Sequence, residues 1–312
     1  MVGAGSRGGR QRECRLTRAS LTKRLRIHLL EPLLSRRPRH SAPDSATQIG
    51  LSLLYKALAR SGGKLPAFRD VGFKAYSQAD EDGILLYIFS LIGTANKKCV
   101  EIAAGDGTEC NTANLIIHHR WSGLLFDGNR DLVCRGQRFF RKHPATYPYP
   151  PKFVCTWITR ENVNDLIREN GFEGEIDLLS LDVDGVDYWL WDAIDVISPR
   201  VVVVEYQDIL GPERACTVPY RADFCAREHP TPHRMLDYAG ASLPALVKLG
   251  KRKGYRLVGC NTYGYNAFFM KSGVGEDTFC EISVGECFNH PRAIWGMKER
   301  FPAVKDLPWV DV

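Results

Sequence analysis

The residues whose types and spacing best suit ligand binding lie in two short apolar runs and in the turns that follow them. The first run contains Glu101 and leads into Gly105, Asp106 and Gly107, and the second run ends at Asp127. A glycine lets the backbone approach a bound ligand closely, because it has no Cβ. A carboxylate at the end of a strand can accept hydrogen bonds from ribose hydroxyls. The spacing therefore predicts a site for a nucleoside-bearing cofactor.

The loop itself indicates which cofactor this is. The dinucleotide fingerprint Gly-x-Gly-x-x-Gly has a third glycine, but Cys110 stands at that position here. Asp106 and Glu109 also put negative charge where phosphates would sit. S-adenosylmethionine has no phosphate and carries a positive sulfonium, so we predict it as the cofactor. The alternatives are a nicotinamide cofactor, or a tight turn in which the glycines serve geometry only.

Candidate catalytic residues follow two later apolar runs. Asp182 and Asp184 end the run at 176–183, and Glu205 ends the run at 200–205. Ligands bind at the carboxyl ends of parallel strands, so these carboxylates are placed to take a proton from an acceptor hydroxyl. Asp182 is the first choice as the base and also counts among the cofactor-binding residues, and Glu205 is the second choice. Alternatively, each carboxylate satisfies amides of a loop or of a helix N-terminus.

Metal chemistry is a less favoured alternative at the same carboxylates. A magnesium ion that bridges Asp182, Asp184 and a diol of the acceptor is compatible with these residue types. The pattern around them lacks the glutamate that an EF-hand needs at position twelve, where Ala193 stands. We therefore predict no dedicated metal site.

Two further groups of residues are candidates for cofactor contacts. Tyr76, Ser77 and Gln78 precede the first core helix, and Gln78 is predicted to bind the methionine end of the cofactor. Thr156 and Trp157 follow the third apolar run and could contact adenine. For Trp157, packing inside the buried strand is the favoured role.

The remaining pattern positions these residues on an α/β fold. Ser77 and Asp80 form a capping-box pattern ahead of a helix. Apolar runs alternate with helical patterns, and uninterrupted apolar runs are typical of parallel strands covered on both faces. We therefore predict a doubly wound, mostly parallel sheet. Its strands are expected at 99–104, 124–127, 153–157, 176–183 and 200–205, followed by a terminal hairpin at 255–260 and 265–271.

The positive charge of the chain is concentrated at its N-terminus. Residues 1–42 hold eleven Lys or Arg against Glu13 and Glu31, so they carry a formal charge of about +9 and the remainder about −3. The folded part therefore gives no electrostatic argument for nucleic acid. We expect 1–42 to be a basic, flexible extension, and its composition also suits a mitochondrial presequence or peripheral contact with an anionic membrane. No apolar window approaches the ~20 residues of a transmembrane helix, so a cytoplasmic protein is expected, with a mitochondrial one as the alternative.

Several segments together resemble class I S-adenosylmethionine-dependent methyltransferases, most closely those of the FkbM type. They are CVEIAAGDGTECNT, WSGLLFDG, IDLLSLDVDGVDYW, PRVVVVEY, ASLPALVKLGKRKGYRLVGCN and NAFFMK. The resemblance, over about residues 74–272, implies a Rossmann-like methyltransferase fold with seven strands in the order 3-2-1-4-5-7-6, the last antiparallel. We accordingly expect a methyltransferase domain at 43–272 and a C-terminal extension at 273–312 that packs on it.

The resemblance also implies residue roles and an activity. It maps its first motif onto Glu101, Gly105 and Gly107, and its ribose-binding acid onto Asp127. Its fourth-strand motif, Asp-x-Glu-Gly-x-Glu, maps onto Asp182, Asp184, Gly185 and Asp187. This chain has aspartates throughout, so the carboxylates of Asp184 and Asp187 lie one methylene further back than those of the glutamates they replace. The implied reaction is methylation of a hydroxyl on a sugar, glycan, glycolipid or secondary metabolite. An NAD(P)-dependent oxidoreductase and an inactive interaction protein with a cofactor fold are the alternatives, and the sequence does not indicate an oligomeric state.

Overall fold

The computed structural model describes residues 42–233 and 235–312. Residues 43–312 form one compact unit. The expectations for the basic segment 1–42, as a presequence or as a membrane contact, lie outside the described residues except for Ala42. None of the described helices is long and apolar enough to cross a membrane.

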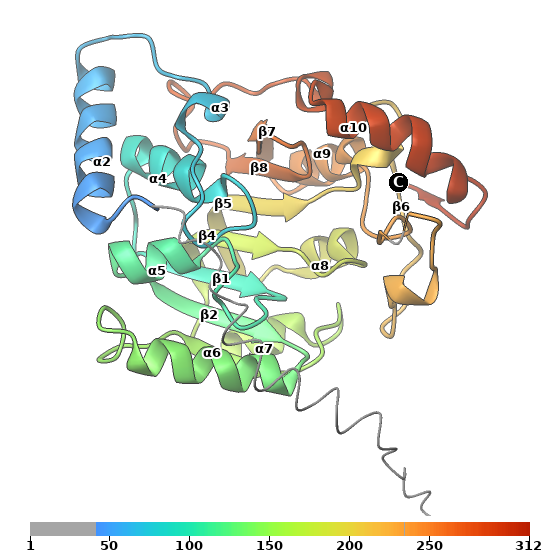
Figure 1. Cartoon of the computed structure of the whole chain (residues 1–312), viewed down its shortest axis with the longest axis horizontal. Coiled ribbons are helices and arrows are strands. Elements are labelled where there is room, and N and C mark those ends of the chain that lie inside the picture. The colour runs from blue at the N-terminus through green and yellow to red at the C-terminus, as the bar shows by residue number, and fades with distance from the viewer. Residues whose placement is uncertain (1–41, 234) are drawn as a thin grey trace, which may run out of the picture. The chain divides into compact units, whose positions relative to one another are not determined.

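A seven-stranded sheet forms the centre of this unit, in the order β3-β2-β1-β4-β5-β8-β7 (Figure 1). The first five strands pair in parallel, and β8 is antiparallel to both of its neighbours. Because β6 lies outside this sheet, β7 and β8 are its sixth and seventh strands, so the predicted order and the antiparallel last strand are confirmed. The strands span Lys98–Ile102 (β1), Ser122–Asp127 (β2), Lys152–Cys155 (β3), Gly174–Leu181 (β4), Ile197–Glu205 (β5), Tyr255–Cys260 (β7) and Asn266–Lys271 (β8).

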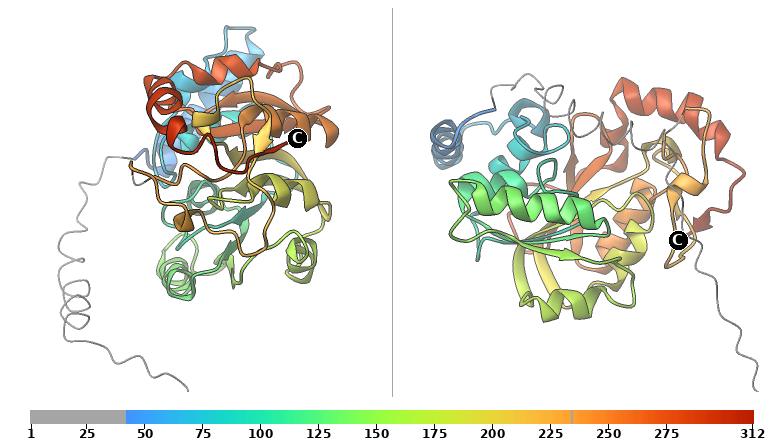
Figure 2. Two further views of the ribbon diagram at one scale, coloured as in Figure 1. Left: turned by 90° about the vertical axis from the view of Figure 1, so that its right-hand side faces the viewer. Right: turned by 60° about the horizontal axis from the view of Figure 1, so that its bottom comes forward.

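Helices cover both faces of the sheet, which makes it doubly wound (Figures 1 and 2). One apolar core lies under α2, α4, α5 and α6, and the other under α7, α8 and α9. These helices span Ser45–Arg60 (α2), Glu81–Ile92 (α4), Ala113–His119 (α5), Arg130–Lys142 (α6), Val163–Glu169 (α7), Asp187–Ala193 (α8) and Leu243–Arg252 (α9), and a short turn of helix lies at Phe68–Val71 (α3).

The apolar runs of the sequence are explained by this burial on both faces. In β5, Val201 and Val203 enter one core, whereas Val202 and Val204 enter the other. Successive side chains of a strand point to opposite faces, so a central strand between two helical layers has no solvent-facing position to fill with a polar residue. Polar side chains within these strands, such as Glu101 in β1 and Asp177 in β4, are buried and hydrogen-bonded to other parts of the chain, so polar groups that could meet a ligand collect where the strands end.

Most local expectations are confirmed, with one correction at α4. The hairpin at β7 and β8 is present, and Ser242 caps α9 by accepting a hydrogen bond from the Ala245 amide. The predicted cap of the first core helix is wrong, because α4 begins at Glu81 with Asp80 as its N-cap. Ser77 instead donates to Asp82, and this carboxylate also accepts the backbone amides of residues 75–77 at 2.6–2.7 Å. The loop before α4 is thereby wrapped around a side chain of the helix.

The segment after β5 and the C-terminal residues cross the same end of the sheet (Figure 2). They form a second, two-stranded sheet in which Cys216 of β6 pairs with Asp311 of β9. The Tyr238 hydroxyl also donates to the Pro308 carbonyl at 2.9 Å. The elements of this layer are Asp208–Leu210 (η1), Cys216–Thr217 (β6), Ala226–Glu228 (η2), Val284–Phe288 (η3), Pro291–Trp295 (α10), Gly296–Arg300 (η4), Phe301–Ala303 (η5) and Val310–Asp311 (β9).

A truncation at Trp191 tests the core beneath this layer. Trp191 is 1% exposed, and its ring centroid lies 4.9 Å from that of Phe269. We expect Trp191→Ala to lower the free energy of unfolding by about 3–5 kcal/mol, because it leaves a cavity in a packed core. Urea denaturation followed by circular dichroism measures this loss. Trp295→Ala, at a tryptophan that is 44% exposed, is the matched control, and an equal loss in both variants would contradict the assignment.

Candidate functional site

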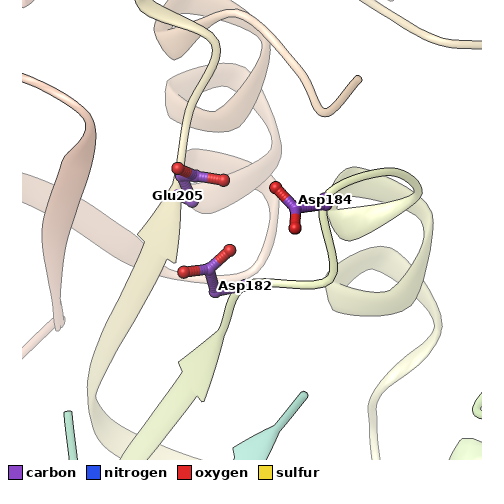
Figure 3. Close-up of side chains that lie close together, drawn as sticks. All are labelled: Asp182, Asp184 and Glu205. Carbon is purple, nitrogen blue, oxygen red and sulfur yellow. The ribbon is translucent and has the colours of Figure 1, made fainter. Parts of the chain in front are cut away.

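Three predicted catalytic carboxylates meet at the carboxyl end of the sheet. Asp182 follows β4 directly, Asp184 lies two residues further on, and Glu205 is the last residue of β5. Figure 3 shows their side chains facing a common space. One carboxylate oxygen of each lies within 4.8 Å of the others. Parallel pairing of β4 with β5 places both strand ends at one edge, and this is what brings the residues together.

Asp187 fixes the loop that carries two of these carboxylates. It is the first residue of α8 and accepts the amides of Val183 at 2.8 Å and Gly185 at 3.1 Å. Between them, Asp184 has a φ of +53°, a left-handed conformation that aspartate tolerates better than most residues. Within the described residues, loop amides bond to Asp187 and not to Asp182, Asp184 or Glu205. The alternative of an amide-satisfying carboxylate therefore describes Asp187.

The clustered carboxylates raise one another's pKa values. Asp182 and Glu205 are both half-buried. Burial first, and then the charge of Asp184 and the other nearby carboxylates, raises the pKa of Asp182 to about 7. Burial and the adjacent Asp182 likewise raise the pKa of Glu205 well above its ordinary value. Like charges this close resist simultaneous ionisation, so the charge on either carboxylate favours the protonated form of the other.

A pocket of about 630 Å³ opens on one side of this cluster. Asp127 lines it at the end of β2 and accepts the Gly105 amide at 2.8 Å and the Asn129 amide at 2.7 Å. A carboxylate has about four acceptor positions, so about two remain for a ligand. A Cβ at Gly105 would meet no atom of the described residues within 4 Å. The remaining walls are mostly apolar, with Phe126, Leu132, Trp157, Ile158, Val186 and Phe224 among them.

Three of the predicted cofactor residues instead hold the loop in shape. Glu101 is buried and accepts the amides of Asn111 and Thr112, both at 2.9 Å, at the start of α5. Asp106 pairs with Arg135 at 2.7 Å. A Cβ at Gly107 would come within 2.9 Å of two aromatic rings, so this glycine permits close packing. In the described part of the chain, none of these three lines either pocket at the carboxylate cluster.

The favoured role for Trp157 is wrong. The third strand ends at Cys155, two residues earlier than expected, and Trp157 is 57% exposed rather than packed inside the sheet. It lines the larger pocket together with Thr156, and its indole donates to the Ala222 carbonyl at 2.6 Å. Both residues therefore belong to the wall of the same pocket as Asp127.

A second pocket of about 380 Å³ lies on the other side of the carboxylates. Asp184 lines both pockets, and Glu205 lines this one. Gln78 contributes from the loop that Asp82 holds in place. Arg292 and Arg300 reach this pocket from the C-terminal segment. Sequence patterns gave no signal for these arginines, because only the folding of residues 273–312 over the strand ends brings them here.

Comparisons with known proteins give structural likeness only. No protein-family model matches the chain, and no curated protein matches it. It is similar to an O-methyltransferase family protein from Burkholderia thailandensis, at 11% identity over 82% of this chain and 85% of that one, with a TM-score of 0.40. It is also similar to a Podospora anserina methyltransferase with bound S-adenosylhomocysteine, at 12% identity over 83% and 99%, with a TM-score of 0.38. A third is magnesium protoporphyrin IX methyltransferase from Synechocystis with bound S-adenosylmethionine, at 10% identity over 83% and 100%, with a TM-score of 0.35.

The raised pKa of Asp182 can be tested by removing a neighbouring charge. We expect Asp184→Asn to lower the pKa of Asp182 from about 7, because the Asp184 carboxylate opposes its ionisation. Carbon-detected NMR titration of the side-chain carboxyl groups between pH 4 and 9 measures this change. Asp165→Asn, at an exposed aspartate paired with Arg168, is the control and should leave the Asp182 titration unchanged. An Asp182 pKa near 4 in the wild-type protein would refute the raised value.

Proposed function

We propose that this protein is an S-adenosylmethionine-dependent methyltransferase that methylates a hydroxyl oxygen. The observation that carries the proposal is the carboxylate cluster between two pockets. The larger pocket has a strand-end aspartate, Asp127, on its wall, and the smaller pocket is lined by Glu205. This arrangement can hold a nucleoside on one side and an acceptor on the other, with a proton acceptor between them.

The larger pocket fits the nucleoside part of the cofactor. Asp127 would accept hydrogen bonds from the ribose hydroxyls, and Thr156 and Trp157 would contact adenine. Gly105 leaves room beside this wall. Gln78, in the second pocket, would bind the methionine end. Arg227 is the one cation among the described lining residues of the larger pocket, against Asp127 and Asp184, so the charge suits a cationic ligand better than a diphosphate.

The described residues supply alignment and a base. When bound, S-adenosylmethionine supplies a methyl group that its sulfonium already activates toward displacement. The protein must therefore hold the acceptor oxygen in line with that methyl, and such alignment can contribute roughly 7–11 kcal/mol. Asp182 would accept the proton that the attacking hydroxyl loses, and Glu205 would share it. A base whose pKa is about 7 is well matched to this task at neutral pH.

The acceptor class rests on the FkbM resemblance. It points to a hydroxyl on a sugar, glycan, glycolipid or secondary metabolite. In support, the smaller pocket is lined by polar side chains from several segments, including Gln78, Gln207 and Arg292. We further propose that residues 43–272 carry the activity and that residues 273–312 complete the acceptor wall. A cytoplasmic location remains part of the proposal.

A divalent cation is a second candidate occupant of the cluster. Three carboxylates with oxygens within 4.8 Å of one another are the oxygen ligands that magnesium and manganese prefer. The cation would be held by Asp182, Asp184 and Glu205, and it would stabilise an ionised acceptor hydroxyl. This candidate differs from the general-base proposal in needing both Asp182 and Glu205 to be ionised.

Calorimetric titration with S-adenosylhomocysteine tests the cofactor site. We expect micromolar binding to the wild-type chain and a loss of roughly 1–3 kcal/mol in Asp127→Ala, because polar ribose groups would lose a buried partner. Asp131→Ala, at an exposed aspartate in the first turn of α6, is the matched control. No binding at millimolar ligand, in a protein that remains folded, would overturn the methyltransferase proposal, and tight binding of NADH instead would favour the oxidoreductase.

Substitution of Asp182 distinguishes a base from a metal ligand. As a general base, Asp182→Asn should lower methyl transfer by about 10²–10⁴-fold while S-adenosylhomocysteine binding persists. Methyl transfer in the wild-type protein should also be insensitive to EDTA. Titration with Mn²⁺ followed by electron paramagnetic resonance gives an independent measurement. Stoichiometric Mn²⁺ binding that is lost in both Asp182→Asn and Asp184→Asn would assign the cluster to a metal instead.

A further inference from the structure

The smaller pocket is lined by side chains of both charges. Asp184 and Glu205 line it from the strand ends, and Arg292 and Arg300 enter from the C-terminal segment. Asp208, which also lines the pocket, contacts both arginines, at 2.7 Å from Arg292 and 3.5 Å from Arg300. The two arginines therefore share one carboxylate, yet they differ in what their remaining nitrogens contact.

Arg300 shows a guanidinium whose hydrogen bonds are satisfied. Its Nε and Nη2 atoms both donate to Asp237, at 2.7 and 2.6 Å, and Nη1 faces Asp208. Nε and Nη2 form one edge of the guanidinium, the edge that presents two parallel N–H bonds to a carboxylate or phosphate. The Arg300 side chain is 3% exposed, so this buried arginine links three segments of the fold and its Nε–Nη2 edge is occupied by Asp237.

Arg292 also contacts Asp208, but its Nε–Nη2 edge has no hydrogen-bond acceptor among the described residues. Its Nη1 donates to Asp208 at 2.7 Å, which fixes one end of the guanidinium. The guanidinium carbon lies over the Tyr265 ring, 5.0 Å from its centre, which is a cation–π contact. Among the described residues, no hydrogen-bond acceptor contacts Nε or Nη2 of Arg292. The side chain is 30% exposed and lines the pocket.

We propose that the Nε–Nη2 edge of Arg292 binds a carboxylate or phosphate group of the methyl acceptor. That the ligand is the methyl acceptor rests on the proposed function, whereas the anion site itself rests on the contacts of Arg292. The acceptor is then a hydroxylated molecule with an anionic group, such as a sugar acid or a sugar phosphate. The anionic group docks at Arg292 and the hydroxyl lies toward Asp182 and Glu205. A neutral sugar would leave the guanidinium edge without a partner, and such an unmade bond costs affinity.

Two features make this edge a built site and not an incidental surface arginine. The guanidinium is restrained from two sides before any ligand arrives, by Asp208 and by Tyr265, so little side-chain freedom is lost on binding. Asp208 is 1% exposed and is itself held by Arg300. The buried ion pair of Asp208 and Arg300 thus holds the carboxylate that Arg292 contacts in place.

Titration with three related sugars tests the proposal on the full chain. The probes are D-glucose, D-glucuronate and D-glucose 6-phosphate, each measured by calorimetry with and without saturating S-adenosylhomocysteine. We expect at least one anionic probe to bind roughly tenfold or more tightly than glucose, as a charged bidentate hydrogen bond predicts. Whichever anion binds more tightly identifies the carboxylate or the phosphate as the source.

Variants at Arg292 show whether this edge is responsible. Arg292→Gln should abolish the preference for the anion, and Arg292→Lys, which keeps the charge but loses the paired N–H bonds, should retain only part of it. Arg168→Gln, at an exposed arginine on α7, is the matched control and should change nothing. Unchanged S-adenosylhomocysteine binding and thermal melting would show that the variants are folded.

The outcomes separate this inference from the proposed function. Equal affinity for the three sugars, no binding of either anion, or a preference that survives in Arg292→Gln would each contradict the anion site. Failure of S-adenosylhomocysteine to bind would contradict the methyltransferase proposal. An anion preference that depends on Arg292 would stand even then, because the sugars are also titrated without it.

Discussion

The structure depends on one constraint, which is that a polar group inside a parallel strand buried on both faces needs a protein partner, as Glu101 has in the Asn111 amide. Polar groups that are left for a ligand therefore collect at the strand ends. In β4 and β5 the apolar side chains enter two cores, so Asp182 and Glu205 lie at the strand ends and on one edge of the sheet. Like charges are forced together there, and burial raises the pKa of both carboxyl groups. The raised pKa values of these carboxyl groups are thus a consequence of the fold that brings them together.

The carboxylates at this end of the sheet fall into two groups, those that accept backbone amides and those that do not. Glu101, Asp82 and Asp187 accept backbone amides and hold three loops in place. Asp184 and Glu205 line the smaller pocket, whereas Asp182, whose carboxylate lies close to both, is not among the described residues that line either pocket. A functional cluster of acids is therefore supported by structural acids of the same residue types, and only their hydrogen bonds tell the two groups apart.

The layer over the strand ends supplies part of the wall of the smaller pocket. The segment after β5 and the C-terminal residues pair with each other through β6 and β9, and they carry Asp208 and Arg292 into the smaller pocket. The end of the sheet beneath it carries Asp127 on the wall of the larger pocket. Division of labour between a sheet edge and its covering loops is a general property of α/β folds, in which loops carry specificity.

The sequence by itself determined the architecture, because the period of apolar residues is a local signal that burial on two faces makes strong. It predicted the sheet, its terminal hairpin and the three carboxylates as candidates at the strand ends, whereas the order of the strands came from the family resemblance. Only the tertiary structure decided which polar groups remain available. Ser77 binds Asp82 and does not cap α4, Trp157 leaves the sheet for a pocket wall, and Arg292 reaches the site from about ninety residues beyond Glu205. Such contacts join residues far apart in the chain, so no spacing rule encodes them.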